Sequence, residues 1–334
     1  MNSLPLEEPK ITIVVVPRER FSYTQASLES IYKYTEVPFK LVYIDGNSPT
    51  KIKTYLETQA QEKGFKLVRI NRYLSPNHAR NIGLNHVDTE YLVFMDNDVI
   101  VSPGWLKALY NCAEKTGATV VGPLMCQDEP VHKTVHFAGG ESRIITDING
   151  KRHIREKMYK QGQQVADVLP SLQRTETELA EFHCVLVRRA IFDRIGNLDP
   201  QMLCTKEHLD FCMTVREAGG KVYFEPEAIV TYVPGLALEL SDIHFYMLRW
   251  SDAWTMASLE HFREKWQLTE DSYFRVKYKK LGSRRKRSII KPVVRKFKKV
   301  GKKVGLEKKQ MENFLLSLDR KLNHFLTNQY KLQK

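Results

Sequence analysis

The sequence predicts an α/β fold in which a mostly parallel sheet is flanked by helices. Strand-like and helix-like segments alternate regularly over residues 11–95. The strand-like segments are continuously apolar and rich in β-branched residues, as strands are when helices cover both faces of a sheet. An acidic pair, Asp96 and Asp98, follows the fourth of these segments. This is the sheet edge at which open α/β folds bind ligands.

The predicted elements follow one another in a simple order. Strands at 11–16, 39–44, 66–70 and 91–95 alternate with helices at 22–34, 50–63 and 76–86. Each strand–helix–strand unit is expected to cross over in the right-handed sense, which makes its strands parallel. Residues 132–175 are expected to form a loop-rich excursion. The remaining predictions are strands at 119–125, 185–187, 222–224 and 229–232, and helices at 207–219 and 240–266.

The spacing of Asp96 and Asp98 suits metal or nucleotide binding. On an extended backbone, side chains two residues apart share a face and lie about 7 Å apart. A hard cation, or a ribose together with a cation, fits between two such carboxylates. The alternative is a solvated turn at the end of a strand.

Seven short stretches along the chain form a recognisable series of motifs. They are residues 14–17, 44–48, 77–83, 96–98, 188–189 with 195–199, 207–211 and 219–226. In this order they resemble the family 2 glycosyltransferases of the GT-A fold, over about residues 11–235. The resemblance implies a nucleotide-binding, mostly parallel sheet, here followed by a basic helical C-terminal extension.

The resemblance also implies which residues bind the donor nucleotide. Asp45 would accept hydrogen bonds from the base, although an Asx turn that only shapes the loop is the alternative. Arg80 would lie near the base or the diphosphate, where a guanidinium suits phosphate oxygens; a surface ion pair is the alternative. Pro17 and Glu19 lie in a loop that departs from the family pattern, and Glu19 would meet the ribose or the base.

A divalent cation, Mn²⁺ or Mg²⁺, is implied in the same way. Asp96 would contact the ribose or a metal-bound water, and Asp98 would bind the ion that bridges the donor's diphosphate. Many relatives have a histidine ligand where this chain has Tyr232. Tyrosine is a poor ligand for such cations at neutral pH, so donor phosphates would have to complete the coordination shell.

The acceptor side departs from the family pattern. Relatives have Glu-Asp-x-Asp at a helix start, whereas this chain has Glu207-His208-Leu209-Asp210. His208 therefore occupies the position of the catalytic base, and an imidazole can remove a proton near neutral pH. Glu207 and Asp210 remain alternative bases. They could instead cap the helix and form a structural ion pair.

The C-terminal segment is strongly basic. Residues 271–334 contain 21 Lys and Arg against 4 Asp and Glu, whereas the other 270 residues contain 31 against 35. Residues 275–304 are predicted to form a basic amphipathic helix, with an apolar face at 290, 293/294, 297, 300/301 and 304. Such a helix favours an anionic membrane surface over nucleic acid. The apolar stripe within 306–326 would dock on the body, form a homo-oligomer or lie in lipid.

The predicted organisation is an N-terminal tail (1–10), a glycosyltransferase domain (11–270) and the basic helical tail (271–334). Within the domain we expect a donor-nucleotide half (11–125), an acceptor half (126–235) and a helical addition (236–270). The predicted reaction moves a sugar from a nucleotide-diphosphate donor to a hydroxyl of a glycan or lipid-linked acceptor, with inversion. A non-catalytic nucleotide-sugar-binding protein and a nucleotidyltransferase are the alternatives.

The predicted location is the cytoplasm, peripheral to the inner face of the membrane. No apolar run reaches the length of a membrane span, and the N-terminal residues do not resemble a signal peptide. The five cysteines are scattered without disulfide or metal spacing, which suits a reducing compartment.

Overall fold

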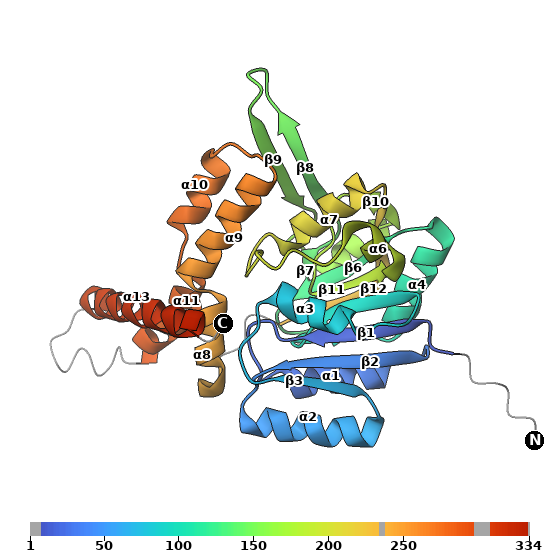
Figure 1. Cartoon of the computed structure of the whole chain (residues 1–334), viewed down its shortest axis with the longest axis horizontal. Helices are drawn as coiled ribbons and strands as arrows, with labels where there is room; N and C mark the ends of the chain where they lie inside the picture. Colours follow the sequence, from blue (N-terminus) through green and yellow to red (C-terminus); the bar gives the residue numbers. More distant parts are fainter. Residues whose placement is uncertain (1–7, 234–237, 297–307, 333–334) are drawn as a thin grey trace, which may run out of the picture.

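The computed structural model of this chain describes residues 8–233, 238–296 and 308–332. Its centre is a mixed sheet in the order β10-β12-β6-β11-β4-β1-β2-β3, with β5 pairing with β12 and β7 with β6 (Figure 1). The strands of this sheet are β1 (Ile11–Val16), β2 (Phe39–Gly46), β3 (Lys66–Ile70), β4 (Tyr91–Asp96), β5 (Val99–Val101), β6 (Val120–Gln127), β7 (Thr134–Phe137), β10 (Thr175–Thr177), β11 (Cys184–Arg188) and β12 (Val222–Tyr232).

The N-terminal half of the sheet has the predicted parallel arrangement. β1 lies between β2 and β4 and is parallel to both, and β3 extends the parallel set beyond β2. The helices that connect these strands are α1 (Thr24–Tyr34), α2 (Thr50–Lys63) and α3 (Pro76–Leu84), with α4 (Trp105–Thr116) following β5. α1 and α2 cover one face of the sheet and α3 the other (Figure 1). The predicted α/β class is confirmed.

The register of the parallel strands gathers their carboxyl ends. Val16 at the end of β1 pairs with Asp96 at the end of β4, and the backbone N–H of Asn97 donates to the carbonyl of Val16 at 2.9 Å. The loop after β1 therefore lies directly beside the acidic pair. Asp45, near the end of β2, belongs to the same edge of the sheet.

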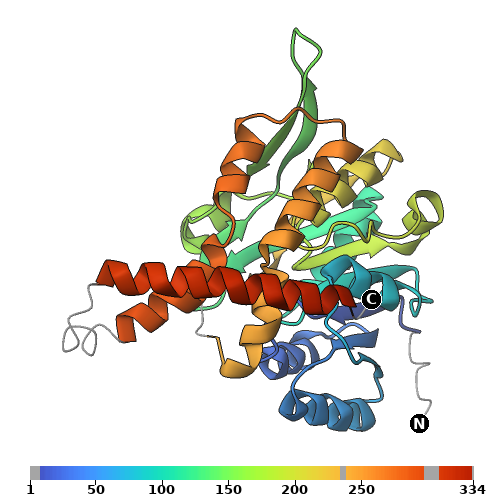
Figure 2. The ribbon, with the colours of Figure 1, turned by 60° about the vertical axis from the view of Figure 1, so that its left-hand side comes forward.

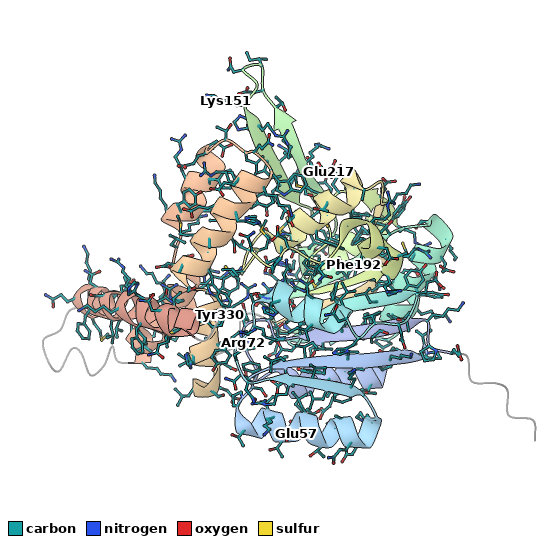
Figure 3. The ribbon with its side chains drawn as sticks, in the orientation of Figure 1. Glu57, Arg72, Lys151, Phe192, Glu217 and Tyr330 are labelled. Atoms are coloured by element: carbon teal, nitrogen blue, oxygen red, sulfur yellow. The ribbon has the colours of Figure 1, made fainter. Side chains whose placement is uncertain are left out.

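The predicted loop-rich excursion at 132–175 is wrong in part. It contains β7 and a separate hairpin of β8 (Gly140–Thr146) and β9 (Arg152–Met158), followed by α5 (Val165–Val168) and the 3₁₀ turn η1 (Leu169–Ser171). The hairpin projects from the sheet, with Lys151 at its tip (Figure 3). β9 buries only Ile154, so its sequence lacks the apolar alternation that indicates a strand.

Two other predicted boundaries change. The strands predicted at 222–224 and 229–232 form one strand, β12, whose pairing with β6 shifts register between Glu225 and Ile229. The helix predicted at 240–266 is two helices, α8 (Leu240–Arg249) and α9 (Asp252–Lys265). The hydroxyl of Ser251 separates them, because it accepts a hydrogen bond from the N–H of Trp254 and so caps α9.

The remaining helices fall into two groups. η2 (Arg189–Ile191), α6 (Phe192–Ile195) and α7 (Glu207–Glu217) lie within the middle of the chain. α10 (Ser272–Lys279), α11 (Ser283–Arg285), η3 (Lys286–Ile290) and α13 (Lys308–Leu332) form the C-terminal part. In Figure 2, α13 crosses the outside of this helical layer. None of the helices described is long and apolar enough to cross a bilayer.

The predicted membrane face of 275–304 needs a correction. Ile290 and Val294, two positions of its apolar stripe, are buried in the protein. η3 packs against α13, which explains the burial of Ile290. Positions 297, 300, 301 and 304 lie outside the described residues.

Candidate active site

A cavity of about 400 Å³ lies beside the loop that follows β1. Its walls come from both the parallel half of the sheet and the C-terminal helices. The lining residues include Arg18, Arg80, Glu156, Glu181, His183, Lys206, Glu207, His208, Tyr232, Arg249, Trp250, Lys277, Lys280 and Arg284.

Asp96 is fully buried behind this cavity and binds three side chains that line it. Arg18 Nη1 donates to Oδ2 at 3.0 Å, and Arg80 Nη2 donates to Oδ1 at 3.0 Å. His183 Nδ1 lies 2.9 Å from Oδ2. The carboxylate of Asp96 is therefore satisfied within the protein. The Nε atoms of Arg18 and Arg80 are buried and have no hydrogen-bond partner among the described residues, so they remain donors for another anion.

Asp98 has the opposite environment. It is fully buried, and neither carboxylate oxygen accepts a hydrogen bond from the described part of the chain. Burial raises the pKa of Asp98 well above its ordinary value, and the neighbouring charges of Glu19 and Asp96 add to the effect. A buried carboxylate without a donor fits the role of a cation ligand.

The site does not contain a ready-made metal cage. In the described ranges, no three His, Cys, Asp or Glu side chains converge on one point. Tyr232, at the position where relatives have a histidine, stacks on the His183 ring with centroids 3.8 Å apart. Burial raises the pKa of the Tyr232 hydroxyl, which keeps it neutral. A bound ion would have to take further ligands from donor phosphates.

On the acceptor side, the structure separates the three alternative bases. His208 lines the cavity, and its Nε2 lies 3.5 Å from Glu181 Oε1. Glu207 also lines the cavity, but it is buried and lies 3.4 Å from Arg249 Nη2. Asp210 does not line it: its carboxylate accepts hydrogen bonds from Trp266 Nε1 and Lys265 Nζ, each at 2.8 Å.

Of the predicted donor and metal residues, Arg80 lines the cavity, whereas the other five lie outside its wall: Pro17, Glu19, Asp45, Asp96 and Asp98. Asp45 is buried, and its two oxygens accept hydrogen bonds from Ser48 while Arg69 forms an ion pair with it. Glu19 is buried and accepts a hydrogen bond from Trp250 Nε1 at 3.0 Å. Pro17 is buried next to Gly46. Of the predicted donor residues, Arg80 and Asp96 are brought together directly.

A comparison with known families assigns the chain to one of them. The glycosyl transferase family 2 model matches residues 12–196, more than half of the chain. The chain belongs to glycosyl transferase family 2.

Several curated relatives match this family 2 chain at low identity. Mouse polypeptide N-acetylgalactosaminyltransferase 15 is 28% identical over 179 residues, covering 53% of the chain and 27% of the relative. Pre-mycofactocin glycosyltransferase of Mycobacterium tuberculosis is 27% identical over 162 residues, covering 47% of the chain and 30% of the relative. Succinoglycan biosynthesis protein ExoW of Rhizobium meliloti is 23% identical over 213 residues, covering 61% of the chain and 62% of the relative. The match thus spans less than two thirds of each relative.

A solved structure supports the fold. The crystal structure of GalNAc-T7 with UDP, GalNAc and Mn²⁺ superposes with a TM-score of 0.51 and 16% identity, covering 83% of this chain and 56% of that one. The GT-A-type architecture of this family 2 member is therefore shown by both its sequence and its structure.

The sequence assigned no role in the site to Arg18, Glu181 or His183; His183, with His132, His136 and His153, suggested only a zinc site that their irregular spacing argued against. Arg18, Glu181 and His183 line the cavity. Arg18 contacts Asp96, which is 78 positions away in the sequence. Its Nη1 also lies 3.1 Å from Nδ1 of His183, which is 165 positions away. No local spacing could reveal such contacts. The only available signal was the basic character of the loop after β1, where the family pattern is lost.

Proposed function

We propose that this chain transfers a sugar from a nucleotide-diphosphate donor to an acceptor hydroxyl, with inversion, in the synthesis of a polysaccharide, glycolipid or cell-surface glycan. The observation that carries the proposal is the presence of two sets of buried groups without partners, near the end of β4 and the loop after β1. Asp98 presents two buried oxygens without a donor, and Arg18 and Arg80 present buried Nε donors without an acceptor. A diphosphate with its cation has the charges that would satisfy both sets.

The donor would lie with its diphosphate toward Arg18 and Arg80. Asp98 would hold a divalent cation, and that ion would supply positive charge to the departing diphosphate. Asp96 would act by orienting the two arginines, because its own oxygens are already bonded to them. The family resemblance implies that Asp45 would meet the base at the end of β2. Because its oxygens already accept hydrogen bonds from Ser48 and pair with Arg69, Asp45 would have to give up one of these contacts to bind a base.

The acceptor would be deprotonated by His208. His208 Nε2 lies 3.5 Å from Glu181 Oε1 without a hydrogen bond, so Glu181 would act through its charge and stabilise the imidazolium that forms when Nδ1 takes the proton. The acceptor oxygen then bonds to the anomeric carbon as the bond to the diphosphate oxygen breaks. Burial alone would raise the pKa of Glu181, but the nearby His208, His183 and His136 lower it on balance, so a carboxylate is present to do this.

Release of nucleoside diphosphate from donor sugars tests the proposal. With Mn²⁺ present, Asp98→Asn is expected to lower release by about 100-fold or more, since a ligand of the cation is lost. Asp88→Asn is the matched control, because Asp88 is an exposed aspartate whose ion pair with Lys40 lies at the surface. Equal release by the wild type and Asp98→Asn would show that the chain does not use this site for catalysis.

A further inference from the structure

α13 is attached to the body by its polar side. Arg285 is buried and donates two hydrogen bonds to Asp319, from Nε to Oδ1 at 3.1 Å and from Nη2 to Oδ2 at 3.0 Å. Asn323 donates to the carbonyl of Met247 at 2.8 Å. Near the end of the helix, Tyr330 is buried and packs edge-on against Trp254, at the place where α13 meets the body (Figure 3).

The opposite side of α13 is apolar and exposed. Phe314, Leu318, Leu322 and Phe325 are 67%, 51%, 42% and 55% exposed. We call these four residues the α13 stripe. Their spacing of four, four and three places them on one helical face, about 17 Å long at the usual rise. They are four of the nine exposed large apolar side chains in the described ranges. Apolar side chains that gather on one exposed face often mark a surface that binds a partner or a membrane.

The charge around the stripe is positive. The only two carboxylates of α13 are used by the body: Asp319 pairs with Arg285, and Glu312 lies 2.8 Å from Lys286 Nζ. Lys321 is exposed and follows Leu318 by three positions and precedes Phe325 by four, so it borders the stripe. A helix side that is apolar and bordered by a lysine suits an anionic lipid surface.

A second copy of the chain is a poorer occupant. Pairing two stripes would bring like charges such as Lys321 and Lys321 of the other copy close together. Four side chains on one helix also offer far less area than the roughly 1,200 Å² that a stable interface buries.

We propose that the α13 stripe lies in the surface of an anionic membrane and that the polar side of α13 fixes the active site above that surface. Arg284 lines the cavity, and the next residue, Arg285, holds α13 through Asp319. The cavity wall and the membrane-facing helix are thus joined through consecutive residues. Given the proposed function, this favours an acceptor that is itself carried on the membrane; the membrane contact does not depend on that function.

Vesicle binding by the full chain tests the proposal. Wild type is expected to sediment with phosphatidylcholine vesicles that contain phosphatidylglycerol, and much less with phosphatidylcholine alone. Replacing Phe314, Leu318, Leu322 and Phe325 by serine should weaken binding to the anionic vesicles by about 10-fold or more. Because these side chains are exposed, the melting temperature should hardly change. Ile145→Ser with Ile148→Ser, two exposed apolar residues of the β8–β9 hairpin region, is the matched control and should bind as wild type does.

Two results would overturn the proposal. The first is anionic vesicle binding by the four-serine variant that equals wild type, which would assign binding to the basic residues alone. The second is a wild-type dimer that the variant loses, without any vesicle binding. Nucleoside diphosphate release measured without vesicles should be unchanged in the variant. Absence of release in wild type would reject the proposed function and leave the membrane result standing.

Discussion

At the level of single residues, the site depends on which buried charges have partners. Asp96 is bonded to two arginines and lies beside a histidine, Asp210 is bonded to Trp266 and Lys265, and Asp98 accepts no hydrogen bond from the described residues. A buried charge without a partner costs several kcal/mol. Its presence therefore suggests a ligand that completes it, which is why Asp98 is a better candidate for chemistry than Asp210.

His208 and Asp210 can be distinguished by mutation. His208→Gln is expected to lower the transfer rate by about 100- to 10,000-fold, the range for loss of a general base, with little change in melting temperature. Asp210→Asn should lower stability by about 1–3 kcal/mol, since hydrogen bonds to a buried carboxylate are weakened, while the rate stays within a few-fold. Transfer rates and melting curves of both variants provide the check. A rate loss in Asp210→Asn as large as that in His208→Gln would contradict this assignment of the base.

Lys277 offers a test through pH. Burial, followed by the charge of Lys206, lowers the pKa of Lys277 from 10.5 to about 8. Between these two values the unfolded chain binds more protons than the folded one, so this group makes stability rise with pH through that window. Below about pH 8 the cost of the buried charge is fully present.

Lys277→Met should therefore be more stable than wild type at pH 7, by about 1 kcal/mol after discounting for partial exposure. The advantage should shrink as the pH is raised to 10. Melting temperatures of the two proteins should be compared across this pH range. The difference between them reports the titration of Lys277, because groups that titrate alike in both proteins cancel. A constant difference between the two proteins would contradict the lowered pKa.

At the level of elements, the regular part of the fold could be predicted and the polar part could not. The predicted helix at 50–63 and strand at 66–70 coincide with α2 and β3, because β-branched and apolar runs separated by turn residues carry a clear signal. The β8–β9 hairpin was missed because one of its strands buries a single residue. That hairpin brings Glu156 to the cavity, where it pairs with Lys206.

The apolar stripe at 306–326 shows the same contrast between what the sequence predicts and what it leaves open. Its spacing predicted an amphipathic helix, and α13 spans 308–332. The spacing could not show which side faces the body. Asp319 and Asn323 are buried although they are polar, because Arg285 and the backbone of α8 supply partners that lie far away in the sequence.

The attachment of α13 can be tested at Asp319. Asp319→Ala leaves the buried Arg285 with Asp252 as its remaining carboxylate partner among the described residues. Breaking a buried pair in this way costs about 3–5 kcal/mol, and the effect should be local because α13 lies on the outside of the molecule. Hydrogen exchange should therefore accelerate in residues 308–332 and not in β4. Glu312→Gln is the matched control, since Lys286 is partly exposed and such a pair contributes less than about 1 kcal/mol. Equal protection of α13 in both variants would contradict the role of Arg285.

At the level of the whole molecule, the boundary predicted at 270/271 crosses one packed unit. The family 2 model ends at residue 196, yet the cavity takes Lys277, Lys280 and Arg284 from beyond residue 270. Phe274 is buried in the same apolar cluster as the sheet. The basic character of the segment predicted an independent tail, because composition does not report which cations face inward.

Two truncations separate the parts of this segment. Removing 308–334 should lower the melting temperature by a few degrees, because Trp254 loses Tyr330, but should leave nucleoside diphosphate release intact. Removing 271–334 also deletes Phe274 and the wall that carries Lys277 and Arg284. Loss of a buried phenylalanine alone costs about 3–5 kcal/mol, so we expect both a much lower melting temperature and loss of release. Measuring both quantities on both truncations is decisive: full release by the shorter protein would mean that the C-terminal helices only cover the active site and take no part in it.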